Sequence, residues 1–477
     1  MNTRVMFQLL RSAILTSLLL GATASAQTVP AVQTAPLAKK ILTVAVLLPE
    51  ENSPFMPASQ ILLKGIEATN ATSSDAANLV LLPRKSNQSI FSQLQDAALA
   101  GADVAIGPLA KDSVTEISQE AFLPVPIVAL NLTAPGTLMP EMMMTYSMSL
   151  DLEAQQIVNI AIGALPESTS RGSAPKVMIF DVDSALEKRI GDAYAKALEA
   201  ANVQYERVTL TPEMLAHQRK LYEDLPLTEE EQPPKLEKLP DANSNPYEYR
   251  KIRLKNKRLM AEYRARLAFR EPPFFAAFLA MDARTAALVR PRMPRMTRVW
   301  ATSLVHPGDL NLSPNISLTY DLQQVGMVDA PLCLLKNADD FVSRFEVKMP
   351  SNMVDRRLFA FGSDAYTLAK QWAHLQPKIS LDGTTGHLEF DYAVSSEVKR
   401  EGQPMVILSN RIQPRSIEQL QEPLVRPELP NSKQTAAPVT MAAEIQSENA
   451  QQLESNSGKD TGTETPVSKT AEPALKP

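Results

Sequence analysis

Polar side chains that could bind a small ligand follow several short apolar runs of the sequence. Each lies just after a segment typical of a buried strand: Ser53, Asn131, Thr133, Asp181, Asp183, Ser184 and Ser303. In open α/β sheets, ligands bind at the carboxyl ends of the strands, so these residues are candidates for a binding cleft. Ser, Asp and Asn also cap helices that begin after a strand, and capping is the alternative role for the same side chains.

The chemistry of catalysis or metal binding is not indicated by any motif. Asp181 and Asp183 carry the oxygen ligands that a hard cation prefers, but paired acids in a loop also serve as caps. The four histidines share no metal-ligand spacing, and there is no Gly-x-Ser-x-Gly elbow or glycine-rich phosphate loop. We therefore predict no catalytic residue, no metal and no cofactor. A hydrolase remains an alternative for which no nucleophile–base pair can be named.

The first 26 residues have the pattern of a cleavable signal peptide. Arg4 and Arg11 give a positively charged start, an apolar core follows at 13–21, and a small-x-small sequence ends at Ala26. No later apolar run approaches the roughly 20 residues of a transmembrane helix. The only cysteine, Cys333, is interpreted as a buried small apolar residue, so neither a lipid anchor nor an internal disulfide is expected. The mature chain is predicted to be soluble. The net charge of the full sequence, −5, gives no reason to expect nucleic acid as a partner.

Composition divides the rest of the chain into a folded part and two segments without a core. Residues 27–40 resemble a linker, and residues 416–477, rich in Pro, Ser, Thr, Glu and Gln, resemble a disordered tail. The intervening 41–415 are long enough for two lobes.

Apolar runs of strand length alternate with helical patterns twice along the folded part. The expected strands are 41–48, 79–82, 104–106 and 126–130 in the first series, then 176–180, 204–210, 273–281, 298–302 and 324–328 in the second. Strands that are apolar on both faces and separated by helices predict parallel sheets covered on both sides. Two successive series predict two α/β lobes with a cleft between them. Lobe 1 is expected at about 41–148 and 354–378, and lobe 2 mainly at 149–350.

Two local features are interpreted structurally. Gly362 permits a turn, after which Ser363 or Asp364 is expected to cap a helix running to Leu375. Residues 382–386 contain two glycines and are expected to form a turn before a strand at 387–391.

Residues 212–271 interrupt the rhythm of the second series. A Pro- and Glu-rich stretch at 225–240 precedes a basic helix expected at 247–270. One interpretation is a solvated helix with one packed face. The other is a docking surface for an anionic partner or for membrane headgroups, in which Arg253, Lys257 and Arg264 would contact the partner.

Seven segments, in order across about 41–392, resemble a known family. They are Leu47-Leu48-Pro49 with Lys64-Gly65-Ile66, Ile106-Gly107-Pro108-Leu109 with Val114, residues 126–131, Trp300-Ala301-Thr302-Ser303, and residues 325–331, 357–366 and 381–388. Together they resemble the C-terminal domain of the penicillin-binding protein activator family, of the LpoA or LppC type. This chain differs from the family's pattern in the absent lipid cysteine, the lack of room for N-terminal helical repeats, Leu332 in place of a tryptophan, and the insertion at 212–271.

The resemblance implies an α/β, two-lobed type I periplasmic-binding-protein-like fold, with parallel sheets flanked by helices and three crossovers between the lobes. It also implies a periplasmic protein that regulates peptidoglycan synthesis without catalysis, by binding and activating a class A penicillin-binding protein. The alternative is a periplasmic solute-binding protein that delivers a small ligand to a transporter, with that ligand in the interlobe cleft.

Overall fold

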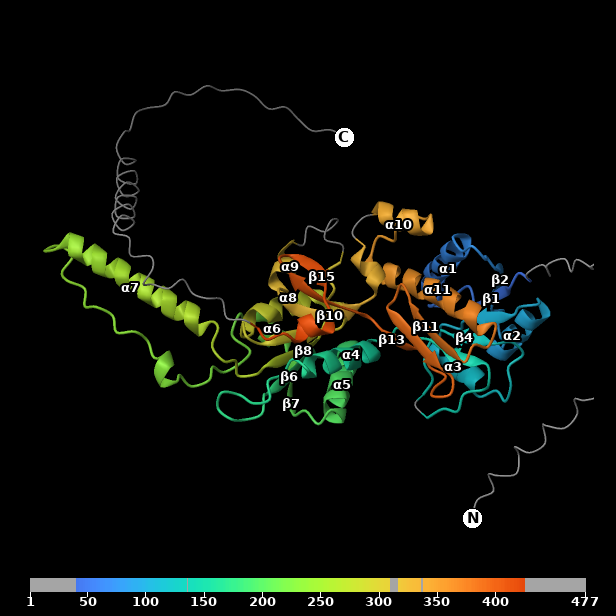
Figure 1. The fold of residues 1–477 in the computed structure, drawn as a ribbon, viewed down its shortest axis with the longest axis horizontal. Coiled ribbons are helices and arrows are strands. Elements are labelled where there is room, and N and C mark those ends of the chain that lie inside the picture. The colour runs from blue at the N-terminus through green and yellow to red at the C-terminus, as the bar shows by residue number, and fades with distance from the viewer. Residues whose placement is uncertain (1–39, 135, 309–315, 336–337, 425–477) are drawn as a thin grey trace, which may run out of the picture. The chain divides into compact units, whose positions relative to one another are not determined.

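The computed structural model describes residues 40–134, 136–308, 316–335 and 338–424 (Figure 1). The predicted signal peptide, nearly all of the predicted linker and residues 425–477 lie outside the described residues. No helix in the described part of the chain is long and apolar enough to cross a membrane.

The first lobe is built on a parallel sheet of five strands in the order β2-β1-β3-β4-β5. The strands are β1 Thr43–Leu48, β2 Asn78–Pro83, β3 Val104–Ile106, β4 Ile127–Ala129 and β5 Met143–Thr145. Helices α2 (Ile90–Leu99) and α3 (Lys111–Ser118) bury apolar side chains against one set of strand residues. Helix α1 (Met56–Ala71) packs against the strand residues that point to the opposite face of the sheet. Both faces are therefore covered, which explains why these strands are apolar throughout.

The second lobe is built on a sheet of seven strands in the order β15-β14-β10-β9-β8-β6-β7. The strands are β6 Val177–Val182, β7 Tyr205–Leu210, β8 Ala276–Ala280, β9 Arg298–Ala301, β10 Val325–Asp329, β14 Gln403–Leu408 and β15 Arg411–Pro414. Strands β6 to β10 are parallel, whereas β14 and β15 are antiparallel and complete one edge. The associated helices are α4 Leu150–Ile162, α5 Ala185–Ala200, α6 Pro212–Ala216, α8 Ala283–Val289 and α9 Ile316–Asp321.

A long helix, α11 (Met353–Trp372), returns the chain to the first lobe. It corrects the expected turn at Gly362, because Gly362, Ser363 and Asp364 lie inside the helix and none of them caps it. The cap is Asn352, whose side chain accepts a hydrogen bond from the backbone N–H of Asp355 at 2.8 Å. Gly362 is required for close packing, since a Cβ there would lie 2.0 Å from the carbonyl oxygen of Leu62 on α1.

A small antiparallel sheet follows α11, with β11 Lys378–Asp382, β12 His387–Asp391 and β13 Lys399–Glu401. The expected turn at 382–386 joins β11 to β12. Apolar residues of this sheet, including Leu388 and Phe390, belong to the same core cluster as α1 and α11. The first lobe therefore continues to residue 401, beyond the expected limit of 378, and the second lobe gains residues 403–414.

The chain passes between the two lobes three times within the described residues. The passages run from β5 to α4, from β10 to α11, and through Gly402 from β13 to β14. The second passage contains the 3-10 helix η4 (Pro331–Leu334), where Cys333 is buried as predicted, and the helix α10 (Ala338–Phe345).

Helix α12 (Ile417–Gln421) corrects the expected start of the C-terminal tail at residue 416. Ser416 forms a capping box with Gln419 at its first turn. Leu420 is buried in the core cluster of α4 and α5. The chain is therefore folded beyond 416, and the remainder of the predicted tail, from 425, lies outside the described residues.

The insertion at 212–271 contains a 3-10 turn, η1 (Glu229–Glu231), and the basic helix α7 (Pro246–Leu267). Helix α7 has no buried residue among its 22. It therefore adds nothing to the apolar cores of the lobes.

Candidate functional site

A buried ion pair joins the lobes at two of the three passages. Glu153, in the first turn of α4, accepts a hydrogen bond from the Nη2 of Arg400 on β13 at 3.1 Å, and both side chains are 2% exposed. The other carboxylate oxygen accepts a hydrogen bond from the backbone N–H of Ser303 at 3.0 Å. Burial raises the pKa of Glu153, and the charge of Arg400 opposes that rise.

A second ion pair lies at the end of β10. Arg357 on α11 donates from Nε and Nη2 to the two carboxylate oxygens of Asp329, at 2.7 and 2.6 Å. The same Nη2 donates to the carbonyl of Ser303 at 3.0 Å. Burial alone would raise the pKa of Asp329, but the charge and hydrogen bonds of Arg357 lower it below its ordinary value. Ser303 thus connects both pairs through its backbone.

Asp364, in the middle of α11, organises the turn between β11 and β12. Its carboxylate accepts hydrogen bonds from the backbone N–H and hydroxyl groups of Thr384 and Thr385, at 2.5 to 2.8 Å. Tyr146 contributes its hydroxyl to the same cluster, 2.6 Å from that of Thr385. Because the carboxylate is fully used by its own chain, Asp364 has a structural role.

A cavity with walls from both lobes has a volume of about 600 Å³. One wall is the loop after β4, including Leu132, Thr133 and Met139, and the opposite wall is the alanine-rich face of α5 with the first turn of α4. Residues 395–397 close a third side. This volume is within the range of small-molecule sites.

Two charged groups line this cavity without a partner among the described residues. Glu397 is half-buried, and its carboxylate makes no hydrogen bond or ion pair there; burial raises its pKa. Its backbone is held by a bridge to Thr145 on β5. Lys196 on α5 is exposed on the opposite wall. Asp151, which also lines the cavity, pairs with Arg189 at 3.3 Å. The cavity thus presents one unpaired carboxylate and one unpaired ammonium, more than 4 Å apart, on a largely apolar surface.

The first-lobe candidates are not brought into one site. Thr133 lines the interlobe cavity. Ser53 lines a different cavity of about 290 Å³ at the carboxyl ends of β1 and β3, together with Arg84 and Gln93. Asn131 donates to the carbonyl of Leu109 at 3.1 Å and so fixes the loop after β4.

The second-lobe candidates are occupied by their own chain. Asp181 is fully buried and pairs with Arg207 at 2.5 Å. Asp183 is exposed and pairs with Lys188. Ser184 stands at the N-terminus of α5 without a side-chain cap bond, and Ser303 is buried between the two ion pairs. No cluster of three or more His, Cys, Asp or Glu side chains that could hold a metal occurs among the described residues.

Sequence reasoning missed the residues that join the lobes. Glu153 gave one signal, an acid on the apolar face of an amphipathic helix, but its partner Arg400 is 247 residues away. It also missed the spacing Ser396-x-x-Lys399, which β-lactam-binding enzymes use. The Lys399 ammonium pairs with Glu401 at 2.6 Å and with Glu389. It makes no contact with the Ser396 hydroxyl in the described structure, so this pair lacks the arrangement of a nucleophile and its base.

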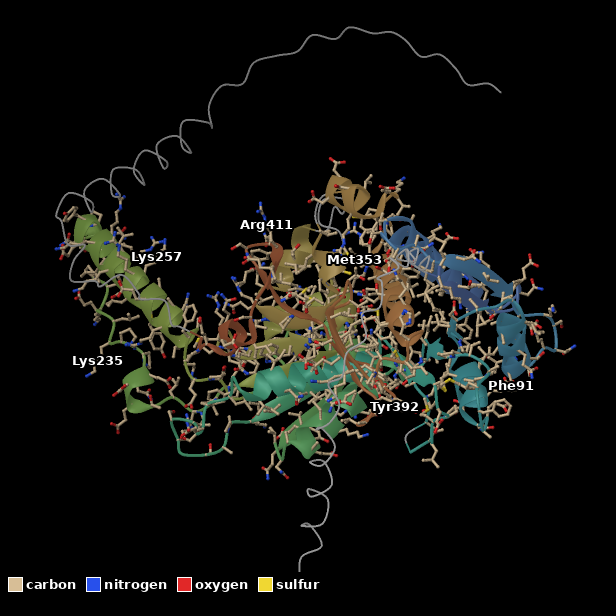
Figure 2. The ribbon with its side chains drawn as sticks, turned by 45° about the vertical axis from the view of Figure 1, so that its right-hand side comes forward. Phe91, Lys235, Lys257, Met353, Tyr392 and Arg411 are labelled. Atoms are coloured by element: carbon tan, nitrogen blue, oxygen red, sulfur yellow. The ribbon has the colours of Figure 1, made fainter. Side chains whose placement is uncertain are left out.

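The basic helix α7 has two distinct faces. Arg253, Lys257 and Arg264 fall within about 40° of one another around the helix axis, and all three are exposed. Lys255 and Tyr263 lie on another face, where the preceding segment contacts the helix through Glu237 and Glu231. Figure 2 labels Lys257 on α7 and Lys235 on this segment.

The two-lobed arrangement is similar to solved structures at low sequence identity. A Chromobacterium violaceum structure, assigned to a branched-chain amino acid ABC transporter, is 21% identical with a TM-score of 0.54, over 76% of this chain and 99% of that chain. Full-length LpoA from Haemophilus influenzae is 16% identical with a TM-score of 0.53, over 79% of this chain and 59% of LpoA. The LpoA C-domain, described as a regulator of PBP1A, is 16% identical with a TM-score of 0.52, over 78% of this chain and 100% of the domain.

The protein has a type I periplasmic-binding-protein-like fold. The fold class predicted from the sequence is confirmed. Comparisons with protein-family models and with curated proteins gave no match. The type I periplasmic-binding-protein-like fold hosts both a regulator and a transporter-associated protein among these structures, so similarity of fold does not select between their functions.

Proposed function

We propose that this protein is a non-catalytic regulator in the periplasm, which promotes peptidoglycan synthesis by binding and activating a class A penicillin-binding protein. The observation that carries the proposal is the pair of buried ion contacts at the interlobe passages, Glu153–Arg400 and Asp329–Arg357. The ordered sequence segments and the similarity to the whole LpoA C-domain support the same conclusion.

The ion pairs matter for function because moving the lobes apart would cost the free energy of breaking them. Removing one partner of a buried pair leaves an uncompensated buried charge, at a cost of about 3–5 kcal/mol. A lobe rotation that pulled Arg400 away from Glu153 would incur a similar penalty. A transport receptor must open and close around its solute, whereas a regulator that presents a surface to a protein partner benefits from fixed lobes. The two pairs therefore favour the regulator.

The surface proposed to contact the synthase is the exposed face of α7 that carries Arg253, Lys257 and Arg264. Helix α7 contains eight cationic and two acidic residues, so it should accelerate encounter with an acidic partner and make binding sensitive to salt. None of the three side chains makes an ion pair with another described residue. Their replacement should therefore change binding with little effect on folding.

The test is a binding titration of the mature chain against a class A penicillin-binding protein, with the transpeptidase rate followed in parallel. We expect saturable binding and a raised rate. The triple variant Arg253→Glu, Lys257→Glu, Arg264→Glu should bind at least tenfold more weakly. A control with the same charge change on exposed residues elsewhere, Lys64→Glu, Lys111→Glu, Lys348→Glu, should bind like the wild type. Absence of any response to the wild-type chain would reject the proposal.

A solute-binding protein is the second candidate, and the interlobe cavity supports it. Glu397 and Lys196 place opposite charges on different sides of a largely apolar space, which suits a small ligand with both kinds of charge. In that case a small envelope metabolite should raise the melting temperature of the wild-type chain. The rise should be lost in Glu397→Gln, and the synthase should neither bind nor respond.

A further inference from the structure

Helix α7 is accompanied along one face by an acidic segment of its own chain. We call residues 225–237 the acidic strap; it contains Glu229, Glu230, Glu231 and Glu237. Figure 1 shows this segment running beside the helix. Tyr263 donates from its hydroxyl to the carbonyl of Glu231 at 3.0 Å. Arg270, just beyond the helix, pairs with the Glu231 carboxylate at 3.3 Å.

The second contact of the strap lies nearer the start of the helix. Glu237 pairs with Lys255. The side-chain amide of Asn256 donates to the carbonyl of Glu237 at 2.8 Å and accepts from its backbone N–H at 3.1 Å. An asparagine that pairs with both backbone groups of one residue recognises an extended peptide without regard to the strap's side chain at that position.

The spacing of the two contacts fits an extended segment lying along a helix. Glu231 ends the 3-10 turn η1, and the six residues from there to Glu237 span at most about 20 Å of extended chain. Lys255 lies about 18 Å along the helix axis from Leu267, the last residue of α7, and Arg270 follows three residues beyond that end. Pro233 and Pro234 between the glutamates favour the extended polyproline conformation. The face of α7 therefore matches two carboxylates on an extended peptide, in charge and in distance.

The strap is held by polar contacts, and none of its residues is buried. The Lys255 and Glu237 side chains are 58% and 47% exposed, and exposed ion pairs contribute little to stability. The Arg270–Glu231 pair is less exposed, at 14% and 23%, and Arg270 also donates to the carbonyls of Leu225 and Pro226. Two of the strap's three leucines, Leu227 and Leu236, are 40% and 49% exposed, so no apolar core fixes it. A purely structural strap would be expected to bury such side chains against the helix.

We propose that the face of α7 formed by Lys255, Asn256 and Tyr263, together with Arg270 just beyond the helix, docks an extended acidic segment of the partner protein, and that the acidic strap occupies this surface in the unbound chain. The proposal rests on the proposed function only in taking α7 as the partner-contact helix. The two faces of α7 then have different roles. The face with Arg253 attracts the partner by its charge. The face covered by the acidic strap releases the strap and binds an acidic segment of the partner in its place.

The test uses the full chain and a fluorescent synthetic peptide with the sequence of residues 225–240, followed by anisotropy. The wild type should bind the peptide weakly, because its own strap is tethered at a high effective concentration. The double variant Glu231→Gln, Glu237→Gln should bind it about threefold to tenfold more tightly, since neither the exposed Glu237–Lys255 pair nor the less exposed Glu231–Arg270 pair then holds the strap. Adding Lys255→Gln to that variant should abolish the gain, whereas adding Arg253→Gln should leave it.

Two outcomes would overturn the proposal. If the double variant binds the peptide no better than the wild type while its helix content and melting temperature are unchanged, the strap is a structural brace. If Arg253→Gln weakens peptide binding as much as Lys255→Gln, or if the opened variant binds vesicles of anionic lipid and not the peptide, the face has no preference for an acidic peptide. Since no synthase is present, failure here is distinguishable from failure of the proposed function.

Discussion

At the scale of single residues, Glu153 has the most demanding position in the molecule. It lies in the first turn of α4, where the helix dipole favours an acid, yet its side chain is buried between the lobes. Burial raises its pKa, and the charge of Arg400 and the hydrogen bond from the Ser303 N–H oppose that rise. The balance between desolvation and pairing is therefore set by residues from three distant segments.

Replacing Arg400 with methionine should destabilise the protein by about 3–5 kcal/mol at pH 7, because Glu153 would be buried without a countercharge. The sign of the pH dependence follows from the raised pKa. A carboxyl whose folded-state pKa exceeds its unfolded value loses stability as pH rises, so the penalty should shrink from neutral pH toward pH 5 as Glu153 takes up a proton. Urea unfolding at several pH values measures this.

The double variant Glu153→Gln, Arg400→Met is the matched control for that experiment. With no charge left to bury, it should recover part of the lost stability at pH 7 and show little pH dependence. A single variant Arg400→Met that is as stable as the wild type at neutral pH would mean that Glu153 reaches solvent, and that the ion pair does not join the lobes.

Residue roles were predictable from the sequence only where they depend on near neighbours. The burial of Cys333 followed from its apolar surroundings. The cleft candidates did not converge, because the tertiary fold, and not the local sequence, decides which partner a polar residue after a strand binds. Asp181 is an example: it pairs with Arg207, which lies on the adjacent strand β7. Glu153 and Arg400 meet only through the completed topology.

At the scale of elements, the closest packing in the first lobe is between α1 and α11. A Cβ at Gly65 would lie 2.1 Å from the carbonyl oxygen of Phe359, and one at Gly362 would lie 2.0 Å from that of Leu62. Each helix therefore places a glycine against the backbone of the other. The sequence signal at Gly362 was interpreted as a turn because glycine is a poor helix former; the tertiary contact overrides that preference.

Gly65→Ala and Gly362→Ala should each lower stability by about 1–3 kcal/mol, because the helices must move apart to admit the methyl group. This direction is opposite to the gain of up to about 1 kcal/mol that alanine gives in an unconstrained helix. Gln60→Ala, at an exposed position of α1, is the control and should be neutral or slightly stabilising. Thermal unfolding compares the three; a rise in melting temperature for either glycine variant would contradict the close approach.

At the scale of the whole molecule, the alternation of strands and helices was enough to predict two α/β lobes, because parallel strands carry a strong apolar signal. The passage of the chain from the first lobe back to the second, between β13 and β14, was not predictable. Gly402 and Pro404 are residues that usually end a strand, yet β14 joins the edge of the second sheet by antiparallel pairing with β10. Where the folded body ends was misjudged for a similar reason, since α12 is short and surrounded by polar sequence.

The end of the folded body leads to a prediction with two truncated chains. A chain that ends at Leu424 should unfold like the full-length protein, whereas one that ends at Arg415 should be less stable by about 2–3 kcal/mol. The difference arises because α12 buries Leu420, a contribution of about 1.5–3 kcal/mol, and because Arg298 donates to the Leu420 carbonyl at 2.6 Å and Gln421 to that of Ile160 at 3.1 Å. Leu420→Ala in the full-length chain should reproduce most of the loss and separates the effect of the side chain from that of shortening. Equal denaturation midpoints for the two truncations would show that α12 is not part of the cooperative unit of the second lobe.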